Sequence, residues 1–211
     1  MENSDSHAAI GFDPKNLLQP TLAYFAEHLD RNDPAAVLQA ALLLVTLSGH
    51  GTSRINSTTP SALHPIRVGE QLEKLPYVTA EDVVAALMHD TTEDTPITRD
   101  QVRLIFRDYV ANLVDACAYI PEIRARDGWE GDLDLVTRAV AFGPIAVLLK
   151  TVDILDSMRT YYQLPRMFQE GLVRCGKEWL KHRHMLRPKW QGEADKLEAK
   201  IAEIEAFLAT A

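Results

Sequence analysis

Two histidines and two aspartates stand where they could together hold a metal ion: His64, the adjacent pair His89 and Asp90, and Asp153. Imidazole nitrogens and carboxylate oxygens are ligands of borderline and hard divalent cations, and the set offers two of each. Adjacent helical side chains diverge by about 100°. His89 and Asp90 can therefore share an ion only where a helix end points into a crossing of helices. Four protein ligands would leave an octahedral ion with places for water and a substrate oxygen.

Two more acids follow the histidine–aspartate pair. Glu93 and Asp94 each lie four residues after one member of the pair, on the same face if the helical turn continues. Carboxylates beside a metal-bound water are suited to orient it and to take its proton. Taken singly, these acids and His89 are equally typical of caps, turns and helix ends. Asp153 is different, because it lies in the apolar run VLLKTVDIL and a buried lone carboxylate is costly unless it is paired or metal-bound.

The elements that must position these residues are predicted to be helices. Thr79 with Asp82, and Thr98 with Gln101, have the spacing of a capping box at a helix start. Apolar residues recur at helical spacing, prolines fall between the periodic segments, and no convincing strand pattern occurs. The fold class is therefore all-α. The helices are predicted at Pro34 to Ser48, His64 to Leu75, from Thr79 through Met88, from Thr98 through Val114, twice between Leu133 and Arg159 with a break at Gly143-Pro144, and after Pro188.

The organisation along the chain is predicted as one domain with two short additions. We expect a flexible tail at residues 1–16, a catalytic-type domain at 17–188, and a C-terminal helix at 189–211 that packs on the domain or is appended to it. Ala125 to Asp132 (ARDGWEGD), which is charged and contains glycine, is the best candidate for a loop.

The composition excludes some classes of function. The chain has 211 residues, an apolar share of 46% and a formal charge of −8, which is ordinary for a globular domain but opposes a nucleic-acid groove or an anionic membrane surface. The longest apolar stretch, Ala35 to Leu47, is too short to span a bilayer. Cys117 and Cys175 form no CxxC motif, and the N-terminus has no signal-peptide pattern. We expect a cytoplasmic protein; a homo-oligomer stays open.

Common phosphate-binding and hydrolytic motifs are missing. The sequence contains neither of the Gly-rich phosphate loops, G-x-x-x-x-G-K-[ST] and G-x-G-x-x-G. It also lacks the G-x-S-x-G elbow and H-E-x-x-H. Phosphate chemistry, if present, must therefore use another device, for which the histidine–aspartate set is the candidate.

His64, His89-Asp90 and Asp153 together resemble the HD-domain metal-dependent phosphohydrolases. The surrounding sequence is more specific: four segments resemble, in order and spacing, the hydrolase domain of RelA/SpoT homologues. These segments are HPIRVGEQLEKL, AALMHDTTEDTPIT, LIFRDYVANLVDAC and LLKTVDILDSMRT. The resemblance runs from about residue 50 to 160 and implies an HD-domain bundle of about 8–10 helices. It points to a stand-alone small alarmone hydrolase of the metazoan SpoT-homologue type.

The resemblance also implies an activity and a set of roles. The activity is Mn²⁺-dependent hydrolysis of the 3′-pyrophosphate of guanosine 3′,5′-bispyrophosphate (ppGpp or pppGpp), giving GDP or GTP and pyrophosphate. The substrate would be a small nucleotide, with no nucleic-acid partner. One Mn²⁺ per chain would be bound by His64, His89, Asp90 and Asp153. Glu93 and Asp94 would position and activate the attacking water. The expected substrate contacts are Arg54, Ser157, Arg159 and Thr160.

The chain departs from the family pattern around the nucleotide. Ser53 stands where the family usually has Gln, and Arg54 is displaced by one position. After Asp153 the family commonly has a basic residue and then His/Tyr-Asn, whereas this chain has Ile154 and then Asp156-Ser157. The preferred nucleotide therefore stays open. The alternatives are an HD hydrolase of ppApp, NADPH or a dNTP, and a non-catalytic nucleotide-binding HD domain.

Overall fold

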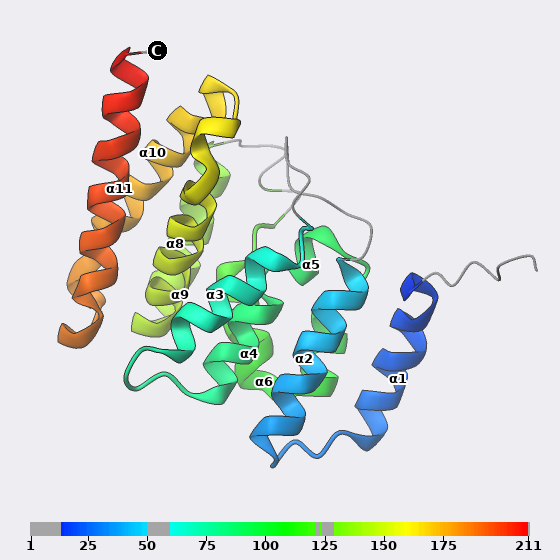
Figure 1. Ribbon diagram of the computed structural model, residues 1–211. Helices are drawn as coiled ribbons and strands as arrows, with labels where there is room; N and C mark the ends of the chain where they lie inside the picture. The colour runs from blue at the N-terminus through cyan, green and yellow to red at the C-terminus, as the bar shows by residue number, and fades with distance from the viewer. Residues whose placement is uncertain (1–13, 50–59, 121–122, 124–128, 211) are drawn as a thin grey trace, which may run out of the picture.

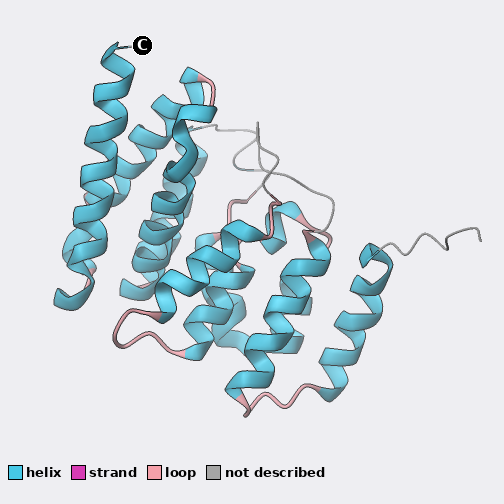
Figure 2. Cartoon of the chain, viewed as in Figure 1, coloured by secondary structure: helices cyan, strands magenta, loops and turns pink. Residues whose placement is uncertain are grey.

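The computed structural model describes residues 14–49, 60–120, 123 and 129–210, and within this part of the chain it is all-α with no β-strand (Figures 1 and 2). The fold class predicted from the sequence is confirmed. Short 3₁₀ segments are η1 (Pro14–Leu17), η2 (Met158–Gln163), η3 (Arg183–Met185) and η4 (Pro188–Trp190). The α-helices are α1 (Leu18–His28), α2 (Pro34–Ser48), α3 (Leu63–Glu73), α4 (Ala80–Met88), α5 (Thr91–Asp94), α6 (Arg99–Cys117), α8 (Trp129–Phe142), α9 (Pro144–Ser157), α10 (Arg166–Leu180) and α11 (Gln191–Thr210).

Helix α9 is the element around which the bundle is built. It contacts α3, α6, α8, α10 and α11, and ten of its fourteen residues are buried. Figure 1 shows α10 and α11 on one side of it and α3, α4, α6, α2 and α1 following on the other. A helix buried on nearly all sides needs apolar residues all round, and the run PIAVLLKTVDIL supplies them except at Lys150, Thr151 and Asp153.

Local signals in the sequence fix the helix starts that matter for the site. Both predicted capping boxes are present: the hydroxyl of Thr79 accepts from the Asp82 backbone N–H, and that of Thr98 accepts from Gln101. The predicted break between α8 and α9 falls at Gly143, whose φ of 124° is open to glycine but strained for other residues. Helix α3 begins at Leu63, and His64 therefore lies in its first turn.

The predicted loop at Ala125 to Asp132 is wrong in its second half. Residues 129–132 form the first turn of α8, while residues 125–128 lie outside the described part of the chain. The prediction weighed the glycines and charges of this segment alone. Leu135 and Ala139, which are buried where α8 contacts α6 and α9, hold the helix that extends back over these residues, so tertiary packing overrides the local signal.

The C-terminal helix packs on the bundle, since α11 contacts both α9 and α10. Gly176 of α10 permits this close approach: a Cβ there would lie 2.8 Å from the Cδ1 atom of Ile201 in α11. Gln71 of α3 donates to Glu193 of α11 at 2.6 Å. The division at residues 16/17 and 188/189 remains a prediction.

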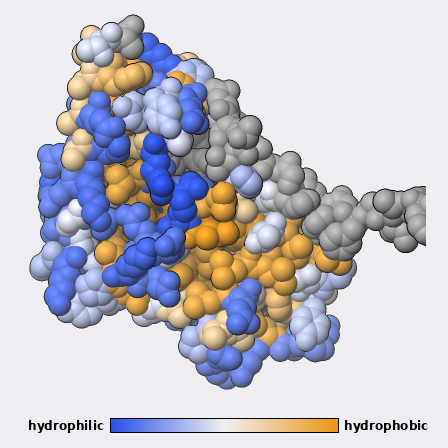
Figure 3. All heavy atoms as spheres, viewed as in Figure 1, coloured by the Kyte–Doolittle hydropathy of each residue, from blue (hydrophilic) through white to orange (hydrophobic). Residues whose placement is uncertain are grey.

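Apolar side chains are also exposed on one face of the molecule. Figure 3 shows hydrophobic residues gathered over α2 and its neighbours, beside a hydrophilic strip. Leu42 and Leu43 of α2 are 39% and 43% exposed. Across the described residues, no helix combines the length and hydropathy needed to cross a membrane.

Helix α6 is interrupted near its middle by a left-handed residue. Arg107 has φ 69° and ψ 178°, which is costly for a residue with a side chain. The guanidinium of Arg31, from the segment between α1 and α2, donates to the carbonyls of Leu104 and Ile105 just before the interruption, at 2.7 and 2.9 Å. It also donates to Ala26 at 2.7 Å. Arg31 therefore joins three carbonyl groups of two helices.

We predict that Arg31→Ala lowers the free energy of unfolding by about 1–3 kcal/mol, because the three carbonyls lose a charged donor. Urea denaturation followed by circular dichroism measures the change. Arg166→Ala is the matched control, since Arg166 only pairs with Glu170 one turn away on an exposed face and should change the stability by less than about 0.5 kcal/mol. Equal losses in the two variants would contradict this role of Arg31.

Candidate metal-dependent active site

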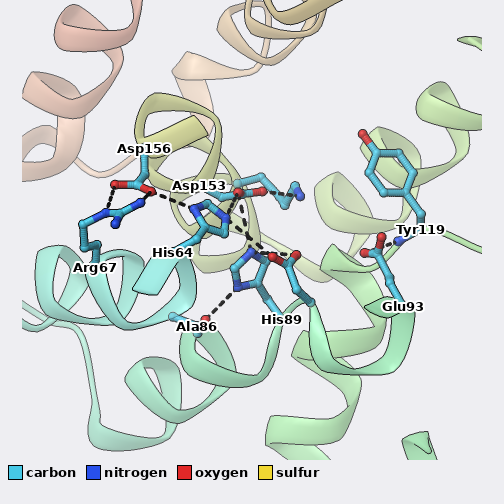
Figure 4. Close-up of polar contacts among 10 residues, drawn as sticks. His64, Arg67, Ala86, His89, Glu93, Tyr119, Asp153 and Asp156 are labelled. Atoms are coloured by element: carbon cyan, nitrogen blue, oxygen red, sulfur yellow. Dashed lines mark hydrogen bonds and ion pairs between the residues drawn. The ribbon is translucent and has the colours of Figure 1, made fainter. Parts of the chain in front are cut away.

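Three separate helical elements bring the histidine–aspartate set together (Figure 4). His64 comes from the first turn of α3, and Asp153 from the middle of α9. Helix α4 ends at Met88, so that His89 and Asp90 form the turn before α5. The backbone N–H of Asp94 donates to the carbonyl of Asp90 at 3.0 Å, which holds that turn. The structure thus provides the helix end, pointing into a crossing of helices, that the adjacent pair requires.

The ligand-type atoms converge on one point. One ligand atom each of His64, His89 and Asp90 can be chosen so that all lie within 4.8 Å of one another. The Nε2 atom of His89 lies 2.9 Å from Oδ1 of Asp90, and that of His64 lies 3.5 Å from Oδ2. Asp153 joins the same point, because its Oδ1 is 2.9 Å from Nε2 of His64 and 3.5 Å from Nε2 of His89.

Both imidazoles are held from behind through Nδ1. The Nδ1–H group of His89 donates to the carbonyl of Ala86 at 2.7 Å, and that of His64 donates to Asp156 at 2.7 Å. Nε2 is therefore the ring atom that each histidine turns toward the cluster. Both rings are almost fully buried, and they meet edge to face with centroids 5.3 Å apart.

The cluster has the chemistry of a cation site. Nε2 of His89 is buried and makes no hydrogen bond with any described group, although carboxylate oxygens lie within 3.5 Å. Burial opposes charge on His89 and His64, yet the surrounding aspartates raise the pKa of both imidazoles. Despite burial, His89 and His64 lower the pKa of Asp90 to about 2. A divalent cation suits such a concentration of negative charge and free imidazole nitrogen, so the residues fit the metal.

Lys150 is the buried counter-charge of the cluster. It lies one turn before Asp153 on α9, and its ammonium donates to Oδ2 of Asp153. Although burial opposes ionisation of both groups, Lys150 holds the pKa of Asp153 well below its usual range. This contact occupies one carboxylate oxygen and leaves Oδ1 directed at the two histidines.

The two acids of α5 lie in different surroundings. Glu93 points toward the start of the segment after α6, where its Oε1 accepts from the backbone N–H of Tyr119 at 2.8 Å (Figure 4). Burial, partly offset by Lys150, raises the pKa of Glu93 to about 7. Asp94 is exposed and lines a cavity beside the cluster. The two side chains therefore do not share one environment, as their spacing had suggested they might.

A cavity of about 830 Å³ adjoins the cluster. Asp90 and Asp94 lie in its wall, and so do three of the predicted substrate contacts, Ser157, Arg159 and Thr160. The fourth, Arg54, lies outside the described residues, as does Ser53. Ile154 is 5% exposed and belongs to the hydrophobic core, so the position after Asp153 faces away from the cavity. Helix α10 also lines the cavity, with the apolar residues Met167, Phe168 and Leu172 and with Arg174.

Three residues of this site were not identified from the sequence: Arg67, Lys150 and Asp156. Their spacing from His64 and Asp153 could have indicated them. Arg67 lies three residues after His64, and Lys150 and Asp156 lie three residues to either side of Asp153, each on the same helix face. The sequence could not show that Arg67 and Asp156 face each other, because 89 residues separate them.

Comparison with known protein families shows to which family the chain belongs. Residues 35–176 match the family model described as HD domain, which covers more than half of the chain. The chain belongs to the HD-domain family. The match contains every residue of the histidine–aspartate cluster, as well as α5 and most of the cavity wall.

Curated relatives of this HD domain come from larger bacterial proteins. A guanosine-3′,5′-bis(diphosphate) 3′-pyrophosphohydrolase of Aquifex aeolicus is 32% identical over 113 residues, which are 54% of this chain and 16% of that protein. A probable GTP pyrophosphokinase of Mycobacterium leprae is 30% identical over 150 residues, 71% of this chain and 19% of that protein. The chain thus spans less than a fifth of the length of these relatives.

A solved structure has the same fold over most of the HD domain. It is described as a metazoan orthologue of SpoT that hydrolyses ppGpp and plays a role in starvation responses, and it superposes with a TM-score of 0.66. The two sequences are 20% identical, and the alignment covers 77% of this chain and 93% of the other. The expected HD-domain helical bundle is therefore confirmed.

The raised pKa of Glu93 leads to a prediction about stability. Between pH 4.5 and about 7 the folded chain keeps a proton on Glu93 that the unfolded chain has lost, so this residue lowers stability as the pH rises through that window. Glu93→Gln keeps an acceptor for the Tyr119 N–H but cannot ionise. We expect it to stabilise the metal-free protein by about 1–2 kcal/mol more at pH 8 than at pH 5, after allowance for partial exposure.

Urea denaturation in the presence of a chelator, at both pH values, measures this difference. A gain in stability that is the same at pH 5 and pH 8 would show that Glu93 ionises as it does in the unfolded chain.

Proposed function

We propose that this chain is a metal-dependent nucleotide pyrophosphohydrolase that removes the 3′-pyrophosphate of ppGpp or pppGpp with Mn²⁺. The observation that carries the proposal is the convergence of His64, His89, Asp90 and Asp153 at the wall of a cavity that is large enough for a nucleotide. The printed activity of the Aquifex relative supports the choice of substrate. The overall reaction consumes one water and gives GDP or GTP with pyrophosphate.

The ion would be held by the Nε2 atoms of His64 and His89 and by the carboxylates of Asp90 and Asp153. When bound, a divalent cation polarises a phosphoryl oxygen and lowers the pKa of water. Other groups of the chain prepare the ligands for the ion. Lys150 keeps Asp153 ionised, and the backbone carbonyl of Ala86 keeps His89 turned toward the cluster.

The acids of α5 would handle the proton of the attacking water. A carboxyl group whose pKa is about 7 can both accept and return a proton at neutral pH, which suits Glu93 for moving a proton from the water toward the ribose 3′-oxygen that leaves. Asp94 is exposed in the cavity wall and would orient the water by accepting its second hydrogen bond.

The rest of the cavity would bind the nucleotide. Arg159, whose side chain is 62% exposed, and Thr160 can donate to phosphate oxygens from the wall formed by η2. Ser157 can donate a single hydrogen bond at a position where the family pattern commonly has Asn. The apolar residues Met167 and Phe168 on α10 provide a surface for the base.

We predict that the purified chain with Mn²⁺ releases pyrophosphate from ppGpp, and that a chelator abolishes this activity until Mn²⁺ is restored. A panel of ppGpp, pppGpp, ppApp, NADPH and dNTPs, with products resolved by ion-exchange chromatography, tests the substrate; Mg²⁺ and Zn²⁺ in place of Mn²⁺ test the metal. Turnover of other nucleotides alone would replace the alarmone with another HD-hydrolase substrate. Nucleotide binding without any turnover would indicate a non-catalytic binding domain.

We predict further that Glu93→Gln and Asp94→Asn each lower kcat for ppGpp by about 10²- to 10⁴-fold, because each removes a group that moves or orients the water. Binding of Mn²⁺, titrated separately, should stay within a few-fold of the wild type. Glu193→Gln is the control, since Glu193 is a buried carboxylate held by Gln71 and Lys196 at the contact between α3 and α11. A full kcat in Glu93→Gln would remove Glu93 from the proposed mechanism.

A further inference from the structure

Asp156 is a buried carboxylate with an unusual number of strong partners. Its side chain is 3% exposed, and Oδ2 accepts from Nδ1 of His64 at 2.7 Å. Arg67 forms a two-pronged contact with the same group, donating from Nε to Oδ1 at 2.8 Å and from Nη2 to Oδ2 at 2.7 Å. Figure 4 shows the three side chains in a row, with Asp156 between Arg67 and His64. Asp156 thus joins α9 to α3 at the edge of the metal cluster.

This contact determines which nitrogen His64 offers to the cluster. Carboxylates lie at hydrogen-bond distance from both ring nitrogens, Asp156 at Nδ1 and Asp153 at Nε2. When Nε2 gives its lone pair to an ion, the proton of the neutral ring is on Nδ1, where Asp156 accepts the hydrogen bond. Nε2 is the atom that lies 2.9 Å from Asp153 and 3.5 Å from Asp90. A partner for the second ring nitrogen of a ligating histidine also fixes the orientation of the ring and raises its basicity.

The two histidines of the cluster depend on different kinds of partner. His89 is fixed by a backbone carbonyl three residues earlier in its own chain segment, which is present whatever the side chains are. His64 lies in the first turn of α3 and takes its partner from a side chain of α9. The Nδ1 side of His64 is therefore held by a side chain from another helix, Asp156, whereas the Nδ1 side of His89 is held by the backbone.

Arg67 offsets the electrostatic cost of burying the Asp156 carboxylate. A buried carboxylate without a partner would be costly and would add negative charge beside Asp153 and Asp90. The guanidinium offsets that charge, and its planar fork fixes the plane of the carboxylate. Arg67 therefore acts on His64 only through Asp156.

We propose that Asp156, held in place by Arg67, is a positioning residue that fixes His64 with Nε2 directed at the metal cluster. This inference rests on the proposed metal site but not on the identity of the nucleotide. It assigns a function to a residue of α9 that neither binds the ion nor takes part in the chemical step.

The test compares Mn²⁺ affinity, measured from the electron paramagnetic resonance signal of free Mn²⁺, in the folded wild type and in variants. We expect Asp156→Ala to weaken binding by about 10- to 100-fold. Asp156→Asn, which can still accept from Nδ1 of His64, should lose less. Arg67→Gln should weaken binding in the wild-type background but not in the Asp156→Ala background, where Arg67 has no carboxylate through which to act.

Glu193→Gln is the matched control, because it removes the charge of another buried, hydrogen-bonded carboxylate beside α3. It should lower the melting temperature of the metal-free protein without changing Mn²⁺ affinity. The proposal is overturned if Asp156→Ala binds Mn²⁺ as tightly as the wild type. If Asp156→Ala does not fold, wild-type affinity in both Asp156→Asn and Arg67→Gln overturns it equally. Failure of the wild type to hydrolyse ppGpp while binding Mn²⁺ would refute the proposed substrate and leave this comparison intact.

Discussion

The burial of two carboxylates on α9 is the constraint on which the rest of the site depends. Asp153 and Asp156 lie one turn apart on a largely apolar helix that is enclosed by five others. Neither can stay ionised there without partners, since removing a charge from water costs several kcal/mol. Lys150 meets Asp153 from the same helix, and Arg67 meets Asp156 from α3. The imidazole of His64 contacts both acids. These contacts fix how α3 crosses α9, and with it the place of the first turn of α3.

For His89 and Asp90 to reach the crossing of α3 and α9, helix α4 must end just before them. Helix α4 packs along α3, and its capping box at Thr79 sets its start. Nine residues later the helix ends at Met88, so that the following pair, His89 and Asp90, reaches the point toward which Asp153 is directed. The short helix α5 then places its acids at the rim, where burial raises the pKa of Glu93 to about 7 while Asp94 stays exposed. The position of the acids thus follows from the length of α4.

The features that could be predicted from the sequence are those with local causes. Capping at Thr79 and Thr98 and the break at Gly143 each depend on residues within one turn. The resemblance to HD domains supplied the fold, and it also gave the ligand set that stays a prediction. What could not be predicted has distant causes. The pairing of Arg67 with Asp156 joins residues 89 positions apart. The carbonyls just before the left-handed Arg107 accept from Arg31, which lies between α1 and α2. The helical start of α8 likewise depends on its burial against α6 and α9, which no pattern within residues 125–132 reveals.

A formal charge of −8 opposes the long-range attraction of a polyphosphate to the chain as a whole. In the structure, the acids that contact the histidines are gathered at one corner of the cavity. The overall charge therefore says little about the charge that a bound phosphate would meet. At that corner three aspartates face two imidazoles, the side chains of Lys150 and Arg67, and the more exposed Arg159, which lies 3.5 Å from Asp156. Lys150 and Arg67 are turned toward Asp153 and Asp156, and they are therefore not available to a phosphate group. The negative excess lies at Asp90 and at Oδ1 of Asp153, the same atoms that the two Nε2 atoms approach. A divalent cation bound there would reverse the sign of that corner, so a polyphosphate can be attracted by a chain whose overall charge opposes it.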